Sequence, residues 1–76
     1  MNNTKRKELK KAIDLLEEAK SRIETIMNEE QEGFDNLNEG LQQSMSGQAM
    51  EEAVGNMETA IDSIDDAISY IEEAQA

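Results

Sequence analysis

A seven-residue repeat of apolar side chains runs through the C-terminal half of the chain and constrains its fold more than any other feature. Three positions of the repeat are occupied almost without exception: by Met50, Met57, Ile64 and Ile71, by Ala53, Ala60, Ala67 and Ala74, and by Val54, Ile61 and Ile68. Apolar residues recurring three, four and seven residues apart predict an amphipathic α-helix. The N-terminal half carries the same kind of stripe, made of Leu9, Leu16 and Ile23, of Ala12, Ala19 and Ile26, and of Ile13 and Met27.

Between the two stripes lies a segment of different composition. The stretch GFDNLNEGLQQSMSG, residues 33–47, holds three of the four glycines and several Asp, Asn and Ser residues, which indicates a break in the helix. We expect one domain over 1–76, with a first helix over about 4–37, a connection over about 38–45 and a second helix over about 46–75. Thr4 or Asn3 can cap the first helix, and Ser44 or Ser46 the second.

A connection of this length returns the second helix antiparallel to the first. Folding the chain about residues 41 and 42 places Leu16 opposite Ala67 and Gly33 opposite Met50. Small residues then oppose large ones, which allows two helices to approach closely. The sequence therefore predicts an all-α fold, an antiparallel two-helix hairpin with a coiled-coil-like, alanine-rich seam. Absent proline and scarce aromatic residues are typical of such a helical chain.

One apolar row is left over if the alanine rows form this seam. It consists of Ile13, Met27, Val54, Ile61 and Ile68. We expect this row to be an oligomer interface, on which a second copy docks to form a homodimeric four-helix bundle. The alternative occupant is a helix or groove of a foreign protein.

The charge distribution is strongly asymmetric. The chain has 18 acidic and seven basic residues, a net charge of −11, and every basic residue lies within the first 22 positions. Such a field attracts basic partners and repels nucleic acid and anionic membranes. We expect a basic host or defence protein to bind an acidic surface on the second helix, and the partner-binding residues to be Glu51, Glu52, Glu58, Asp62, Asp65 and Asp66. The alternative is that these carboxylates only keep the chain in solution.

The composition also argues against several classes of function. Without histidine the chain lacks the usual general base, and without cysteine it lacks thiolate chemistry, so we expect no catalytic site, metal or cofactor. The stretch from Asp35 to Gly40 fails as a calcium loop because Leu37 and Ser46 stand where ligands are required. There is no 18-residue apolar run or signal-like start, so we expect neither membrane insertion nor secretion, but a cytoplasmic location.

The segment from Asn28 to Ile68, with FDNL at 34–37 and LQ at 41–42 as its most distinctive parts, resembles a family of small, mostly uncharacterised proteins of bacteriophages and mobile elements of Gram-positive bacteria. Asn38 stands where that family would have a proline. The resemblance implies a phage accessory role and supplies no catalytic or ligand residues. With the charge it suggests a non-enzymatic inhibitor of a basic host or defence protein, anti-CRISPR-like, acting by nucleic-acid mimicry. The alternative is a structural or assembly protein that forms helical bundles.

Overall fold

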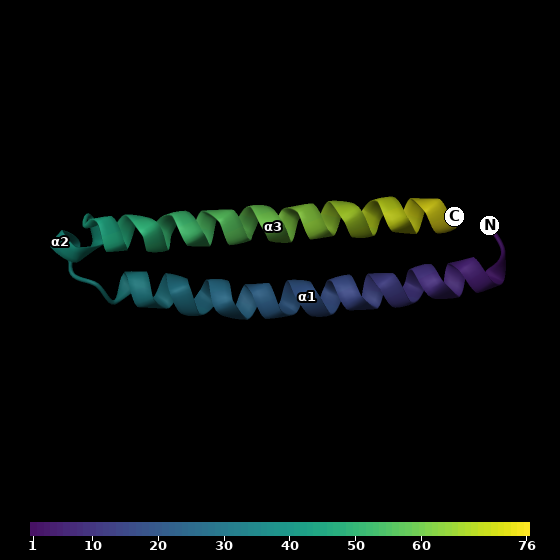
Figure 1. Ribbon diagram of the computed structural model, residues 1–76, viewed down its shortest axis with the longest axis horizontal. Helices are drawn as coiled ribbons and strands as arrows, with labels where there is room; N and C mark the ends of the chain where they lie inside the picture. Colours follow the sequence, from purple (N-terminus) through teal and green to yellow (C-terminus); the bar gives the residue numbers. More distant parts are fainter.

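Two long antiparallel helices and one short helix make up the whole structure (Figure 1). The computed structural model describes residues 1–76 and contains α1 (Asn3–Asp35), α2 (Glu39–Gln42) and α3 (Met45–Gln75). The molecule is a rod of 58 × 15 × 13 Å, with both termini at one end and α2 at the other. The predicted all-α hairpin is confirmed, and both long helices begin and end within two residues of the expected positions.

Polar side chains set the ends of the helices. Ser44 caps α3, as predicted, since its Oγ accepts a hydrogen bond from the Gly47 N–H at 3.2 Å. The prediction for α1 was wrong by one residue, because Asn2 has the extended backbone of a cap and its side chain accepts from the Lys5 N–H at 2.8 Å. The connection is not a plain loop, because Asn38 caps the single turn of α2.

Gly47 forms the corner where α2 meets α3. It is buried, and a Cβ at this position would press against the carbonyl oxygens of Leu41 and Gln42. Only glycine lets the two backbones approach this closely. The Gln42 side chain holds the same corner to α1 by donating a hydrogen bond to the Phe34 carbonyl at 3.1 Å.

The seam between α1 and α3 has two alternating rows of large side chains on each helix. On α3 these rows are Met50, Met57, Ile64 and Ile71, and Val54, Ile61 and Ile68. On α1 they are Leu9, Leu16, Ile23 and Glu30, and Ile13, Lys20, Met27 and Phe34. All of these residues are at least partly shielded, and their steps of four and three residues are those of a coiled coil.

The structure therefore corrects the predicted position of the oligomer interface. Ile13, Met27, Val54, Ile61 and Ile68 were expected to remain uncovered, but they line the seam of a single hairpin, and Val54 and Ile68 are its most buried side chains, 7% and 8% exposed. The physical reason is that a seam centred between two rows of large side chains covers both rows, whereas one centred on alanines covers neither fully.

The rows predicted to form the centre of the seam lie beside it instead. Ala12 and Ala19 on α1 and Ala53, Ala60 and Ala67 on α3 are half-buried at its border. Ile26, in the same row as Ala19, is 55% exposed.

Three contacts fix the register along the rod. Arg6 donates from Nε to the Gln75 carbonyl at 3.1 Å, and Lys20 bonds Asp65 at 2.7 Å. Towards the connection, a Cβ on Gly33 would lie 3.1 Å from Cε of Met50. The predicted pairing of Gly33 with Met50 is thus confirmed.

Two glycine substitutions test the corner at α2. Gly47→Ala should lower the free energy of unfolding by about 1–3 kcal/mol, because overpacking forces the backbone to move. Gly55→Ala is the matched control: nothing lies within 4 Å of its added Cβ, so it should raise stability by about 1 kcal/mol. Urea unfolding followed by circular dichroism measures both, and equal effects would contradict the tight corner.

Truncations on the two kinds of row test the position of the seam. Ile68→Ala removes a buried side chain and should cost about 2 kcal/mol or more. Ile26→Ala removes one that is largely exposed and should change monomer stability by less than about 0.5 kcal/mol. Thermal unfolding at low protein concentration compares the two, and a larger loss for Ile26→Ala would restore the alanine-centred seam.

Candidate functional site

Carboxylates from both long helices lie on one side of the hairpin. On α3 they form a row next to the seam, Glu51, Glu58, Asp65 and Glu72, and on α1 the corresponding row contains Glu17 and Glu24. On each helix the row comes immediately after the seam residues when one turns around the helix axis in the direction of the chain. Two antiparallel helices are related by a two-fold axis perpendicular to the plane that contains both helix axes. This rotation exchanges the helices but keeps each row on its side of the plane, so both rows lie on the same side of the hairpin. We call these six residues the acidic face.

The contacts around Lys20 support this placement independently. Its Nζ lies 2.7 Å from Oδ1 of Asp65, across the seam. The Lys20 pKa is raised above its ordinary value of 10.5, first by the hydrogen bond that Lys20 donates to Asp65 and then by the charges of Asp65, Glu24 and Glu17, while partial desolvation opposes the rise. Carboxylates of α1 and α3 therefore surround the same ammonium group.

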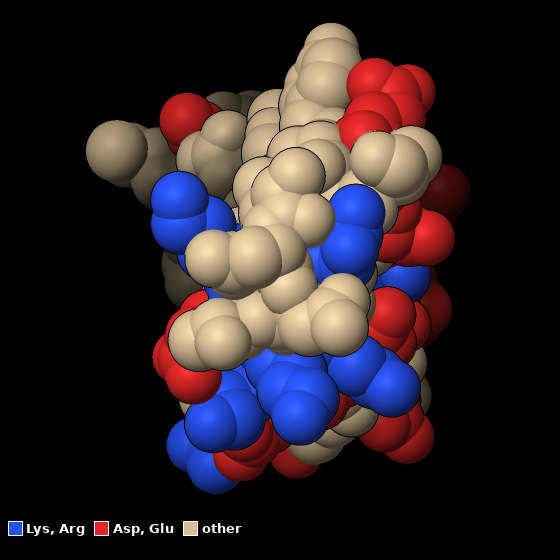
Figure 2. Space-filling model, turned by 90° about the vertical axis from the view of Figure 1, so that its right-hand side faces the viewer, with Lys and Arg blue, Asp and Glu red and all other residues tan.

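Seen along the rod from the end that holds the termini, most of the carboxylates in view gather on the right-hand side, over both helices (Figure 2). Uncharged side chains run across the middle, and the lysines and arginines collect around the lower helix, α1, at this end. The carboxylates of this side therefore come from both helices, and Lys10 continues the α1 row towards the end that holds the termini.

The six predicted partner-binding residues are all exposed on α3, but they do not share one surface. Glu51, Glu58 and Asp65 lie on the acidic face. Asp62 lies on the adjoining row, and Glu52 and Asp66 lie on the side of α3 opposite the seam.

Two members of the acidic face were missed, Glu17 and Glu24. The signal for them was present, since they lie seven residues apart and follow the seam residues Ile13 and Lys20 by four. It was overlooked because the seam had been centred on a different row, which changes the side of the hairpin on which each carboxylate lies.

Asp65 also differs from the other predicted residues because it already has a partner within the chain. Lys20 is the only basic residue between the large side chains of the seam, and a charged residue at such a position selects the register in which it finds a counter-charge. Asp65 supplies that counter-charge. We therefore assign it first to the hairpin and only second to any external partner.

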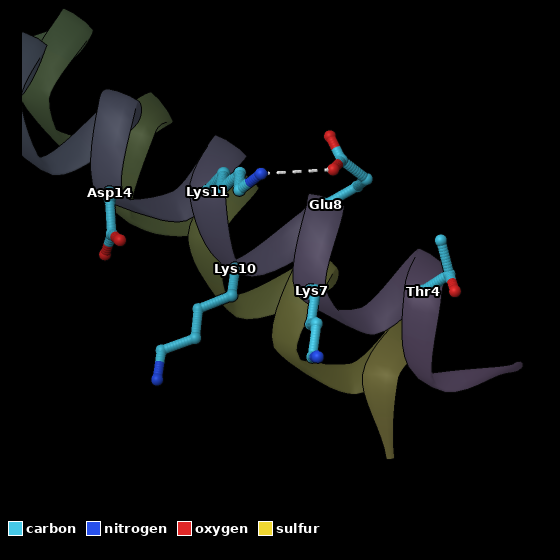
Figure 3. Close-up of a pocket in the computed structure, with 6 residues that line it drawn as sticks. All are labelled: Thr4, Lys7, Glu8, Lys10, Lys11 and Asp14. Carbon is cyan, nitrogen blue, oxygen red and sulfur yellow. Dashed lines mark hydrogen bonds and ion pairs between the residues drawn. The ribbon is translucent and has the colours of Figure 1, made fainter.

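A shallow hollow lies on the outer side of α1. Its lining residues are Thr4, Lys7, Glu8, Lys10, Lys11 and Asp14. In Figure 3 all of them project from successive turns of one helix, with Lys11 paired to Glu8 at 3.3 Å and Lys7 and Lys10 pointing away from that pair. No second element closes the hollow, so it does not enclose a ligand.

No three acidic, histidine or cysteine side chains are grouped so that they could hold a metal ion. None of the helices is both long and apolar enough to span a membrane. Comparison with protein families, curated proteins and solved structures gave no match.

The Lys20–Asp65 pair predicts a pH dependence at the alkaline end. Because folding raises the Lys20 pKa, the pair stabilises the fold fully below pH 10.5 and loses this contribution as the pH rises through the folded value. Asp65→Asn should thus lower the unfolding midpoint at neutral pH, and the difference from wild type should shrink above pH 10.5. Thermal melts across this range provide the measurement, and a pH-independent difference would rule out the ion pair as its source.

Proposed function

We propose that this chain is a non-enzymatic accessory protein of phage type that binds a basic host or defence protein through its acidic face and inhibits it. The observation that carries the proposal is the convergence of carboxylates from two helices on one side of a rod, on a chain of net charge −11. For solubility alone, charges scattered evenly over the surface would serve as well as charges gathered on one side. A concentrated row instead presents a directional field to a partner.

The dimensions of the acidic face favour a nucleic-acid channel as the surface that it occupies. Glu51 and Glu72 are 21 residues apart, which is about 32 Å along an α-helix and close to the roughly 34 Å of one turn of B-DNA. A basic channel that neutralises phosphates over such a length can neutralise these carboxylates in their place. Occupying the channel would block the partner's own substrate, as expected of an anti-defence or anti-CRISPR-like protein.

A second candidate function is a structural or assembly component whose acidity serves solubility only. Large apolar side chains that remain exposed outside the seam favour it, among them Leu15, Ile26 and Tyr70, which are 66%, 55% and 71% exposed. The two functions differ in how salt affects binding. Binding to a basic channel weakens steeply as ionic strength rises, whereas apolar assembly does not.

Charge reversal on one side of the hairpin tests the first function. Glu51→Lys with Glu58→Lys alters the acidic face, and Glu29→Lys with Glu32→Lys is the matched control, because it changes the net charge equally on other sides of the rod. All four side chains are exposed, so the hairpin should stay folded. We expect a pull-down from a Gram-positive host lysate to retain a nucleic-acid-binding protein on the wild type and the control and to lose it on the face variant.

The same capture should weaken at least tenfold between about 50 and 200 mM salt, since several charges are neutralised together. Added DNA or RNA should compete with the chain for the captured protein. If the control variant lost the captured protein to the same extent, net charge alone would explain the loss. Retention by the face variant would contradict the proposed function.

A further inference from the structure

The side of the hairpin opposite the acidic face is uncharged along the whole of α3. Beside the seam it carries Ala53, Ala60, Ala67 and Ala74, and the next row outward carries Ala49, Asn56, Ser63 and Tyr70. All eight carboxylates of α3 lie on its three other exposed rows. Ala12, Ala19 and Ile26 of α1 lie on the same side, by the same geometry that unites the acidic face. We call this the uncharged face.

From this distribution we infer that the uncharged face is the surface on which a second copy of the chain docks, giving a four-helix bundle whose acidic faces point outward. The proposal replaces the predicted interface on the Val54, Ile61 and Ile68 row, which the hairpin itself covers. It does not depend on the proposed function.

The surface area of the hairpin supports a second copy. The chain exposes 5659 Å², whereas a compact monomer of its 8.5 kDa mass exposes about 4,700 Å². The excess of about 1,000 Å² is close to the roughly 800 Å² per partner that a standard stable interface buries. A single hairpin cannot bury this excess surface, because its two long helices are already packed against each other.

The charges decide which face the copies share. Each copy carries −11, so most mutual approaches bring carboxylates together. When two copies are related by a two-fold axis, the uncharged face of one copy contacts the uncharged face of the other. This side-by-side arrangement keeps the carboxylates of α3 away from each other. Its alanines allow the helices to come close, Ile26 adds apolar area within the alanine row of α1, and Leu15 and Tyr70 add apolar area at the edges. The charged residues of α1 on this side form the polar rim; they are Lys5, in the row of Ala12, and Glu8, Arg22 and Glu29, in the row of Leu15.

A different approach of two copies would place the basic start of α1 on the acidic face of the other copy. Salt separates the two arrangements. Contact between basic and acidic surfaces weakens as salt rises, whereas docking through the uncharged faces is unchanged or strengthened, because salt screens the repulsion between two chains of like charge.

Two serines of α3 provide matched variants. Ser63 lies on the uncharged face, Ser69 lies on the acidic side, and both are exposed, so neither substitution disturbs the seam. Ser63→Glu introduces two like charges into the interface and should raise the dimer dissociation constant at least tenfold. Ser69→Glu adds the same charge outside the interface and should change it by less than about threefold. Helicity measured by circular dichroism should be the same in both.

Sedimentation equilibrium at about 1–100 μM and at two salt concentrations is the experiment. The wild type and Ser69→Glu should show twice the 8.5 kDa mass of the chain, and Ser63→Glu mainly the single mass. Acrylamide quenching of Tyr70, the only tyrosine, should fall as the wild type associates.

A wild type that remains monomeric throughout, or dimers weakened by salt, would overturn the proposal. Equal effects of the two serine variants, or a doubled mass with Tyr70 still fully quenchable, would do the same. The result is separable from the proposed function, because the Glu51→Lys and Glu58→Lys variant should lose its basic partner and still dimerise.

Discussion

The contact between two rows of large side chains on α1 and two on α3 is the interaction on which the rest of the structure depends. Residues alternating by four and three steps keep one stripe turned towards the partner helix from Leu9 to Phe34 on α1 and from Met50 to Ile71 on α3. Few other contacts join the two long helices: the Lys20–Asp65 ion pair, the hydrogen bond from Arg6 to the Gln75 carbonyl, and the corner around Gly47. Because Val54 and Ile68 are its only buried apolar side chains, the seam is narrow.

The position of the seam also determines what each side of the hairpin can do. Because the seam is centred between the Met50 and Val54 rows, the six carboxylates of the acidic face lie on one side of it. The alanines of α3 lie on the other side. Lys20 strengthens this division, since it reaches across the seam only on the acidic side, where Asp65 meets it. A single choice of helix phase thus yields both the acidic face and the uncharged face.

The sequence was sufficient for the hairpin and the register, because each rests on residue spacing, and it narrowed the cap of α3 to Ser44 or Ser46. It was not sufficient for the centre of the seam. The three apolar rows of α3 are contiguous, so periodicity alone allows the Met50 row to form the seam with either the alanine row or the Val54 row. The difference is decided by packing across two helices, where Val54 and Ile68 gain more from burial than alanines do. Glu17 and Glu24 were missed for the same reason.

Thiol labelling of two neighbouring residues tests the position of the seam most directly, since the natural chain has no cysteine. Ala67→Cys and Ile68→Cys place a thiol at the border and at the centre of the seam, and labelling at submicromolar protein concentration observes the separate hairpin. The account predicts that the thiol at 68 reacts much more slowly than the thiol at 67. Equal rates, or faster reaction at 68, would contradict the seam and the two faces that follow from it.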